Sequence, residues 1–446
     1  MSNNIVLKKG LNIPISGEAA LETMKTIVPD VVAVKPTDFK GFSPRLLVKE
    51  GDKVLAGSPV LADKQNPEII LTSPVSGTVQ AIVRGEKRKL LAVLVKAEGS
   101  DAVNFGVKDP GTLDASQVKE TLLKSGLWPS IIQRPYGVLA DPAQTPKAIF
   151  VSAFTTAPLA ADPEYAFKDE SAAIQAGVTA VSKIAKVHVS VCDEASPFAK
   201  LHDATIHTVI AKKHPAGNVG VQISHISPIK KGEIVWTLSL LSLAAIGKVF
   251  TTGKLDLSRK VAVTGPAAVK TGYINALPGT PMSALEGCVD TSVETRFISG
   301  DVLSGENIGK DGCLGFFDNQ VTLIKEGRER EILGWANPLR FNQFSSSMAY
   351  FSWLLPKKKY NMDTNTHGGV RAFVCSDVYS KVLPMDIFPV YLVKACLAGD
   401  IDKMEQFGIY EVLPEDLALC EFVDPSKNDI QAIIQDGIDL MIKEMA

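Results

Sequence analysis

The 446-residue chain is 46% hydrophobic, and its 47 lysine and arginine residues nearly balance its 49 aspartates and glutamates, for a net charge of -2. Its length exceeds what one hydrophobic core normally organises and predicts about three domains, or more if some are small. The balanced charge provides neither the basic surplus typical of nucleic-acid binding nor an acidic tail. We therefore expect no nucleic-acid partner.

The cysteines are scattered along the chain without any Cys-x-x-Cys pair. They are Cys192, Cys288, Cys313, Cys375, Cys396 and Cys420. This pattern fits neither a zinc site nor a disulfide framework, and it is typical of a reducing compartment. The N-terminal sequence MSNNIVLKKGLNIPI has too short an apolar run for a signal peptide. We expect a cytoplasmic protein without a bound metal.

Residues 48–79 contain two short half-polar strand patterns, punctuated by Gly51-Asp52 and Gly57. The order of a Gly-Asp turn, a buried Val, a second Gly and a Pro-x-x-Gly turn resembles the flattened β-sandwich of biotinyl and lipoyl carrier domains. We therefore predict a lipoyl-like barrel-sandwich hybrid over residues 1–103. A carrier domain presents a modified lysine at a hairpin tip, but the residues that flank the candidate, Lys64, do not match that motif. We interpret the domain as a scaffold and Lys64 as an ordinary surface lysine.

Strand and helix patterns alternate from residue 148 onward. Runs rich in β-branched residues predict buried strands at 148–154, 187–192 and 205–211, and the spacing of 163–184 predicts a helix between the first two. This alternation predicts a parallel, Rossmann-like α/β layer over residues 104–256. The loop TTAPLAADP after the first strand contains no glycine, so it lacks the turn that lets a backbone approach a dinucleotide phosphate.

The longest uncharged run, IVWTLSLLSLAAIG at residues 234–247, is bounded by Glu233 and Lys248. A bilayer crossing needs about 20 apolar residues. We predict a buried core helix here and not a transmembrane span.

The rest of the chain combines short strands with a helical tail, so the predicted fold class is α+β and multi-domain. Strand patterns around one helix at 282–287 predict a β-grasp module over residues 257–330. Residues 331–378 are predicted to be a β-rich connection, which includes the second arm of a hairpin around Gly327-Arg328. Residues 379–446 are predicted to be a C-terminal helical domain. Its last helix has an apolar face made of Ile430, Ile433, Ile434, Ile438 and Met441.

Two segments have the outline of a cofactor site but lack the residues that it needs. In the loop GLWPSIIQRPYG at 126–137, small residues are scarce between the end glycines, and Pro129 and Pro135 remove backbone donors that a flavin or nucleotide phosphate would use. An iron–sulfur motif of the bacterial type that began at Cys420 would need sulfur ligands at three later positions. Those positions hold Val423, Ser426 and Ile430.

A resemblance to a known family is carried by short segments that are spread in order over nearly the whole chain. They are KKGLNIPI (8–15), SPVSGTV (73–79), GLW (126–128), RPYG (134–137), PLAADPE (158–164), HPAGNVG (214–220), IGKVFTTG (246–253), ISGDVLSG (298–305), GREREILGW (327–335), HGGVRAFV (367–374), PMDIFP (384–389) and EDLALCEFV (415–423). Together they resemble the family of electron-entry subunits related to the flavin-binding subunit of respiratory complex I. Within that family they are most similar to the A subunits of sodium-translocating NADH:quinone reductases.

This resemblance implies a peripheral subunit on the cytoplasmic face of the bacterial inner membrane, with no transmembrane segment. Its partners would be the other subunits of a sodium-pumping NADH:quinone reductase, including integral membrane subunits. Those partners would bind NADH, flavins and iron–sulfur centres, and quinone would be the substrate. This chain would bind no cofactor and hold no complete active site, and its helical domain would be a degenerate ferredoxin-like domain.

A quinone site needs donors for two carbonyls, an aromatic or apolar slot for the ring and, ideally, a cation. Trp128, Arg134 and Tyr136 lie in the proline-framed loop, and Phe39 and Phe42 precede the sandwich. Our hypothesis is that these five residues contribute to quinone binding. The alternative, which a single sequence favours, is that the aromatic side chains pin these loops to the domain cores.

Histidines and lysines elsewhere give weaker indications. His202 and His207 lie close to Asp203, but no third ligand follows at a spacing that suits a metal. His214 is expected to shape the turn HPAGNVG. The lysines at 357–359 are expected to be a solvated charge run, and the alternative is a patch that binds anionic lipid headgroups.

Two other functions stay open from the sequence. The first is the flavin and iron–sulfur electron-entry subunit of the related ferredoxin-linked ion-translocating complex, which predicts a coloured protein with bound iron. The second is a carrier-domain protein modified at Lys64, which predicts an increased mass of the intact chain.

Overall fold

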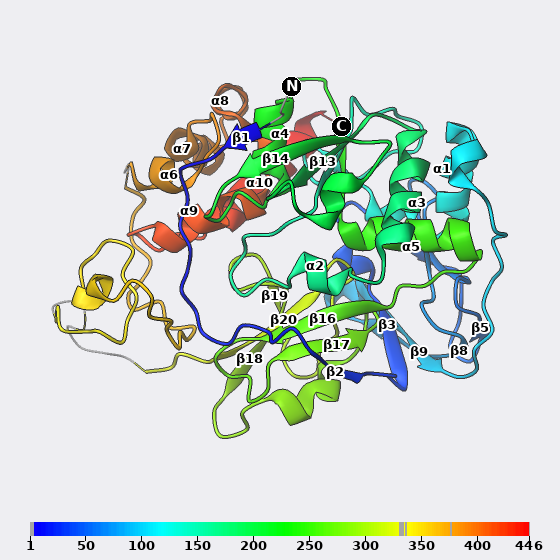
Figure 1. Cartoon of the computed structure of the whole chain (residues 1–446), viewed down its shortest axis with the longest axis horizontal. Coiled ribbons are helices and arrows are strands. Elements are labelled where there is room, and N and C mark those ends of the chain that lie inside the picture. The colour runs from blue at the N-terminus through cyan, green and yellow to red at the C-terminus, as the bar shows by residue number, and fades with distance from the viewer. Residues whose placement is uncertain (1–3, 330–333, 335–336, 375–376, 446) are drawn as a thin grey trace.

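The computed structural model describes residues 4–329, 334, 337–374 and 377–445. Within these residues the strands form sheets of seven, six, four and three strands. Figure 1 shows the seven-stranded sheet and its helices in the upper part of the molecule, the six-stranded sheet below it, and the small N-terminal sheets at the lower right. The C-terminal helices lie at the upper left. The predicted α+β, multi-domain class is confirmed.

The N-terminal strands form two small antiparallel sheets. The four-stranded sheet has the order β3 (Val31–Val34), β9 (Leu90–Ala97), β8 (Gly77–Arg84) and β5 (Lys53–Val54), and the three-stranded sheet has the order β4 (Pro44–Leu46), β6 (Pro59–Asp63) and β7 (Ile70–Thr72). Branched side chains such as Val60, Val93 and Val95 are fully buried. Gly77 packs so closely on the carbonyl of Lys96 that any Cβ would collide with it, and its positive φ also favours glycine. The glycine of the predicted Pro-x-x-Gly turn therefore has a steric cause.

Two strands from the first 27 residues lie outside these small sheets. β1 (Asn4–Val6) pairs in parallel with β14 (Thr205–Ile210), and β2 (Thr23–Thr26) pairs in parallel with β17 (Gly272–Ala276). Both strands fall within the residues 1–103 that were assigned to the sandwich. They pair with the backbone groups of β14 and β17, which would otherwise be edge strands of their sheets. The predicted domain boundaries themselves stay predictions.

The seven-stranded sheet is the α/β layer. Its order is β1, β14, β13 (Val187–Val191), β12 (Ile149–Ser152), β15 (Val235–Leu238), β10 (Ile132–Arg134) and β11 (Val138–Leu139). β12, β13 and β14 pair in parallel, as their spacing predicted. β10 and β11 add an antiparallel edge.

Helices α1 (Ala115–Ser125), α3 (Ser171–Ser182), α4 (Val219–Ile226) and α5 (Leu240–Thr252) accompany this sheet. The single helix expected at 163–184 is divided into α2 (Pro163–Ala166) and α3. α2 begins at the cap Asp162, whose carboxylate accepts hydrogen bonds from the backbone of Glu164 and Tyr165. The turn between the two helices carries Asp169 and Glu170.

The prediction of one core helix at 234–247 is wrong in its first half. Residues Val235–Leu238 form the buried strand β15, and α5 begins at Leu240. Val, Trp and Thr in this run favour a strand, and Ser239 caps the helix by accepting a hydrogen bond from the Ser242 amide. In the part of the chain that the structure describes, no helix has the length and apolar character of a membrane span.

The six-stranded sheet has the order β19 (Glu306–Asn307), β18 (Thr295–Ser299), β20 (Gln320–Lys325), β16 (Arg259–Thr264), β17 and β2. β16 and β20 pair in parallel at its centre. The predicted helix at 282–287 is a 3-10 helix, Met282–Cys288, whose side chains Met282 and Leu285 are buried in the core of this sheet. The β-grasp assignment stays a prediction.

The segment 331–378 is not β-rich where the structure describes it. Between residues 337 and 374 there are isolated bridges of Tyr360 and Asp363 and a 3-10 helix, Phe351–Leu354, but no strand. Its apolar residues do not alternate over any long stretch, and Asn, Ser and Pro interrupt them. The second arm of the predicted hairpin falls largely on residues 330–333 and 335, outside the described residues.

The C-terminal part is helical, as predicted, with α6 (Val378–Val382), α7 (Pro389–Ala398), α8 (Ile401–Phe407), α9 (Ala418–Val423) and α10 (Ile430–Met445). Of the predicted α10 face, Ile430, Ile434, Ile438 and Met441 are fully buried, and Ile433 packs against the same cluster. The amphipathic pattern therefore predicted this helix correctly.

Candidate functional site

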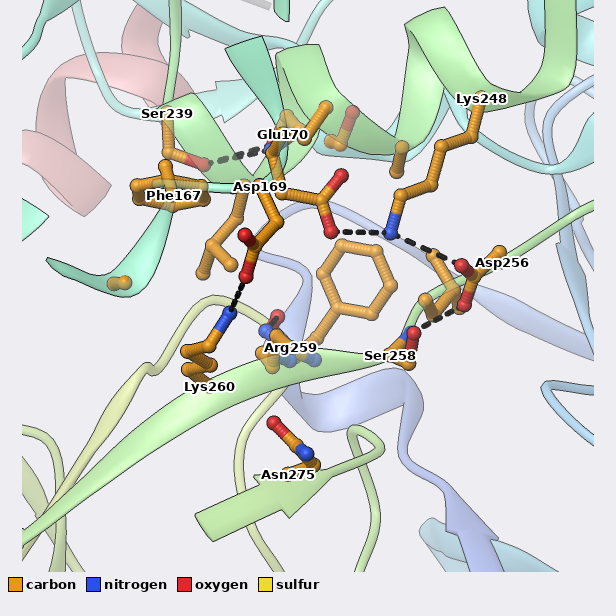
Figure 2. Close-up of a pocket in the computed structure, with 18 of the residues that line it drawn as sticks. Phe167, Asp169, Glu170, Ser239, Lys248, Asp256, Ser258, Arg259, Lys260 and Asn275 are labelled. Atoms are coloured by element: carbon orange, nitrogen blue, oxygen red, sulfur yellow. Dashed lines mark hydrogen bonds and ion pairs between the residues drawn. The ribbon is translucent and has the colours of Figure 1, made fainter. Parts of the chain in front are cut away.

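A cavity of about 410 Å³ lies where the α/β layer meets the six-stranded sheet. α5 and the turn before α3 cover it from above, and the start of β16 forms its floor (Figure 2). Phe316 and Leu257 contribute to the wall, as do Leu127 and Ser130 from the loop 126–137. The cavity is therefore built from segments that are far apart in the sequence.

Arg259 is the most buried charged group of this cavity, with a side chain that is 9% exposed. Its Nη1 donates hydrogen bonds to the carbonyl oxygens of Phe316 at 2.6 Å and Asp318 at 3.2 Å. Its guanidinium lies 5.9 Å from the centre of the Phe316 ring. Burial lowers the pKa of Arg259 to about 10, although Asp318 and Asp38 oppose this shift. Nε of Arg259 has no hydrogen-bond partner.

Ion pairs across the cavity join α5 and the turn before α3 to the segment that enters β16. Lys260 Nζ lies 3.0 Å from Asp169 Oδ2, and Lys248 Nζ lies 2.8 Å from Glu170 Oε1 and 3.0 Å from Asp256 Oδ2. Figure 2 shows the Lys260 pair on one side of Arg259 and the Lys248 pairs on the other. Burial lowers the pKa of Lys248, but Glu170 and Asp256 outweigh burial and raise it overall. The lysines of this wall are thus neutralised by the carboxylates beside them.

A smaller cavity of about 30 Å³ adjoins the first and shares Phe316 and Leu257 with it. Phe39, Asp38 and Gly126 line it. Asp38 accepts a hydrogen bond from the Phe316 amide at 2.8 Å and pairs with Lys35 at 2.9 Å. Burial raises the pKa of Asp38, and Lys35 opposes that shift. This volume holds about one water molecule.

Of the five residues in the quinone hypothesis, Phe39 alone lines either of these cavities. It is 4% exposed, and its ring centre lies 4.8 Å from that of Phe316 and 6.4 Å from that of Phe42, which is also buried. Trp128 is fully buried, donates from Nε1 to the carbonyl of Ala140, and packs edge-on against Trp236.

Arg134 and Tyr136 face the C-terminal helical region. Arg134 is 1% exposed and forms ion pairs with Glu415 and Asp416. The ring centre of Tyr136 lies 6.2 Å from that of Tyr410. The structure therefore places the five residues in three separate environments around the loop 126–137 and does not gather them into one slot.

The histidines are engaged in local contacts. His207 pairs with His188 through ring nitrogens 2.8 Å apart, and burial lowers the pKa of both. Asp203 accepts a hydrogen bond from Thr179. His214 is buried, and its backbone holds the N-terminal segment through Leu11. Among the described residues, no three His, Cys, Asp or Glu side chains gather as a metal site.

The other candidates lie in ordinary surroundings. Lys64 is exposed and directly follows β6, at the start of the loop that leads to β7. Cys420, Ser426 and Ile430 are buried, and Cys420 and Ile430 share a hydrophobic core. Of the lysines at 357–359, Lys359 pairs with Glu18.

Sequence reasoning missed Arg259, Lys248 and the carboxylates around them. A usable signal was present at 256–260, where DLSRK places charged residues directly before the apolar run of β16. Because arginine side chains are rarely buried, an arginine at the start of a buried strand indicates a charged side chain that packs between two parts of the fold. The carboxylate partners at 169–170 could not be found in this way, because their contact depends on tertiary packing.

Family profiles match most of the chain. The profile described as the NqrA N-terminal barrel-sandwich hybrid domain matches residues 5–98, the NqrA second alpha/beta domain matches 113–255, and the NQRA C-terminal domain matches 260–310. The first of these supports the barrel-sandwich assignment of the N-terminal sheets.

Curated relatives match over nearly their full length. A protein of Pasteurella multocida (strain Pm70), named as the A subunit of Na(+)-translocating NADH-quinone reductase, is 37% identical over 99% of this chain and 100% of the relative. The protein of the same name from Yersinia pestis bv. Antiqua (strain Angola) is 36% identical over 97% of this chain and 98% of the relative. A solved NAD+-reducing [NiFe]-hydrogenase in the air-oxidized state aligns with a TM-score of 0.37 and 11% identity, over 72% of this chain and 63% of that one.

Proposed function

The chain belongs to the NqrA family, the A subunits of Na(+)-translocating NADH-quinone reductases, and we propose that it is the peripheral subunit of such a complex at the cytoplasmic face of the bacterial inner membrane. The members of this family are subunits of a multi-subunit enzyme that couples NADH-driven quinone reduction to sodium transport. In this proposal the chain binds no redox group, and NADH, flavins and iron–sulfur centres belong to partner subunits.

The observation that carries peripheral attachment is an aromatic surface at α7 and α8, made of the exposed Phe388 and Tyr391 and the half-buried Phe407. Phe388 is 60% exposed and Tyr391 is 55% exposed, and the three ring centres lie 5.6 to 6.4 Å apart. Figure 1 shows α7 and α8 on the same side of the molecule as residues 337–374, drawn in yellow. Trp353 and Leu354 in that segment are also more than half exposed.

Clustered exposed aromatic side chains are typical of protein interfaces. Ion translocation needs a path through the membrane, and such a path is built by membrane-spanning protein. We therefore propose that the α7–α8 aromatic surface docks on an integral membrane subunit of the complex.

Co-purification tests this attachment. The double variant Phe388→Glu/Tyr391→Glu places two charges on the aromatic surface, and we expect it to be lost from membranes that carry affinity-tagged partner subunits. Val28→Glu is the matched control, because Val28 is 84% exposed and follows β2, which Figure 1 shows in the lower part of the molecule, away from α7 and α8. Retention of the double variant at the wild-type level would contradict the proposal.

An absorption spectrum of the purified chain tests the absence of a redox group. We expect a colourless protein. A yellow-brown protein with bound iron would instead support the electron-entry subunit of the ferredoxin-linked complex.

We also propose that the chain contributes to quinone binding, with Phe39 in contact with the ring and Phe42, Trp128, Arg134 and Tyr136 holding the surrounding loops. This proposal is supported by Phe39, which lines a cavity together with Gly126, the first residue of the predicted loop. Because that cavity is small, a quinone would enter only if the Phe39 and Phe316 rings separate.

Quinone titration of the assembled complex tests the role of Phe39. We expect Phe39→Ala to weaken quinone affinity at least about fivefold, the value of one aromatic contact. Phe198→Ala is the control, because Phe198 is equally buried, at 4% exposed, but lines neither cavity. Equal effects of the two substitutions would show that lost packing, and not quinone contact, causes the change.

A further inference from the structure

The larger cavity combines features that the proposed function does not use. We propose that it binds a small organic acid, a singly charged carboxylate with an apolar or aromatic body, through the guanidinium of Arg259. This inference goes beyond the proposed function, because neither attachment to partner subunits nor the quinone contact at Phe39 requires an anion in this cavity.

Arg259 is a buried cation whose guanidinium forms no direct ion pair among the described residues, and Asp318 and Asp38 offset only part of the effect of burial on its charge. Nine-tenths of its side chain is buried, and Nη1 is used by the two backbone carbonyls. Nε has no hydrogen-bond partner, and in the described part of the chain no carboxylate lies within the 4.0 Å of an ion pair. A buried charge without an opposite partner is unfavourable. A bound anion would supply an opposite charge beside the guanidinium.

The ion pairs around the cavity leave one lining cation, Arg259, without a direct carboxylate partner. The walls carry three cations, Lys248, Arg259 and Lys260, and three carboxylates, Asp169, Glu170 and Asp256. Both lysines already pair with these carboxylates, so Arg259 is the cation left over. One carboxylate matches this single charge. A phosphate dianion would add a second negative charge beside three fixed ones, and their repulsion disfavours it.

The rest of the lining fits an apolar or aromatic body. Phe167, Leu241 and Ala245 lie on the side of α5, and Phe316 and Leu257 lie on the side of β16. Ser239, Ser242 and Asn275 add neutral polar groups. The volume of about 410 Å³ is that of a small-molecule site, because such sites span roughly 300 to 1,000 Å³.

Calorimetric titration of the full-length chain with benzoate, benzamide and inorganic phosphate tests the proposal. Benzamide has nearly the shape of benzoate but no charge. We expect saturable benzoate binding, with benzamide at least about tenfold weaker because it lacks the charge-assisted hydrogen bond. Equal affinity for benzoate and benzamide, tighter binding of phosphate, or no benzoate binding would overturn the proposal.

Two variants locate the binding. Arg259→Gln is expected to weaken benzoate binding at least about tenfold. Because this variant also loses the bonds to Phe316 and Asp318, it can fail to fold, and a second variant therefore keeps Arg259. Ala245→Leu fills the cavity from α5 and is expected to abolish binding, whereas Ala172→Leu on the exposed face of α3 leaves it unchanged. Circular dichroism confirms that the leucine variants are folded.

A competition experiment tests whether the organic acid and quinone bind at different sites. A short-chain ubiquinone is expected to leave the benzoate affinity unchanged in wild-type protein. Competitive displacement of benzoate by that quinone, or unchanged benzoate binding in folded Ala245→Leu, would overturn the assignment. Failure of this site would leave the Phe39 and α7–α8 proposals intact, because their tests use other residues.

Discussion

Arg134 Nη1 lies 2.8 Å from Asp416 Oδ2, and this buried ion pair joins β10 to the C-terminal helical region. The two side chains are 2% and 0% exposed, and Glu415 accepts a second bond from Nη2 of the same guanidinium. Burial alone would lower the pKa of Arg134, but Asp416 and Glu415 outweigh burial and raise it. Gly220 packs against both partners, so that a Cβ there would collide with them. The guanidinium is therefore a link between two parts of the fold.

We predict that Arg134→Ala lowers the free energy of unfolding by about 3 to 5 kcal/mol, because it leaves Asp416 buried without its cation. Urea unfolding followed by circular dichroism measures the change. The control is Lys231→Ala, which breaks the exposed pair with Glu405 and is expected to leave the free energy of unfolding nearly unchanged. Similar losses in the two variants would contradict a structural role of Arg134.

A double substitution separates the cost of an unpaired charge from the cost of a cavity. Arg134→Met/Asp416→Leu removes both charges and keeps side-chain volume, and it is expected to recover most of the stability that Arg134→Ala loses. A double variant no more stable than Arg134→Ala would show that packing, and not the lone carboxylate, dominates the loss.

We predict that Gly247→Ala destabilises the protein, although a change from glycine to alanine inside a helix usually stabilises it. It lies in α5 at the crossing with α3, where a Cβ would collide with the carbonyl oxygen of Ala173. An interior Gly→Ala change normally stabilises a helix by about 1 kcal/mol, but forced overpacking costs about 1 to 3 kcal/mol. We expect Gly247→Ala to lower the urea midpoint, whereas the control Gly287→Ala, which has open space around it, does not. Stabilisation by Gly247→Ala would mean that α3 can move away.

Local patterns predicted the parts of the fold that depend on local chemistry. Each of these segments has the residue pattern of one kind of secondary structure: β-branched runs at β12, β13 and β14, and an apolar helical face at α10. The predictions for them were correct. The run at 234–247 was misread, because a buried strand followed by a buried helix has no polar face to mark either period. The pairing of β1 and β2 with distant sheets depends on which edges are free, which only the tertiary fold decides.

The candidate site was harder to predict for the same reason. Aromatic residues and Arg134 attracted attention in the sequence, but burial and ion pairing occupy Trp128 and Arg134. The cavity at Arg259 forms only when β16 packs against α5, and no motif within either segment records that contact. Residue type alone could not distinguish a charged side chain that forms an ion pair from one that does not.

Lys64 is predicted to carry no biotinyl or lipoyl group. It directly follows β6 and does not lie at the tip of the loop to β7, and Asp63 accepts hydrogen bonds from the backbone amides of Ser43 and Asn66 that fix this loop. Intact mass spectrometry of the chain purified from its own host is expected to give the unmodified mass. A mass increase that disappears in Lys64→Arg would instead support the carrier function.

Glu411 predicts a pH dependence of stability. Burial, together with nearby Asp386, raises the pKa of Glu411 from 4.5 to about 7. The native state thus keeps a proton that the unfolded state loses at lower pH, so stability falls as pH rises between these values. The full difference corresponds to about 3 kcal/mol, and because the side chain is partly exposed, solvent screening reduces this to about 1 to 2 kcal/mol.

Urea midpoints at about pH 5 and about pH 8 measure the fall. Glu411→Gln removes the titrating group and is expected to flatten this part of the profile. A profile equally steep in Glu411→Gln would assign the pH dependence to other groups.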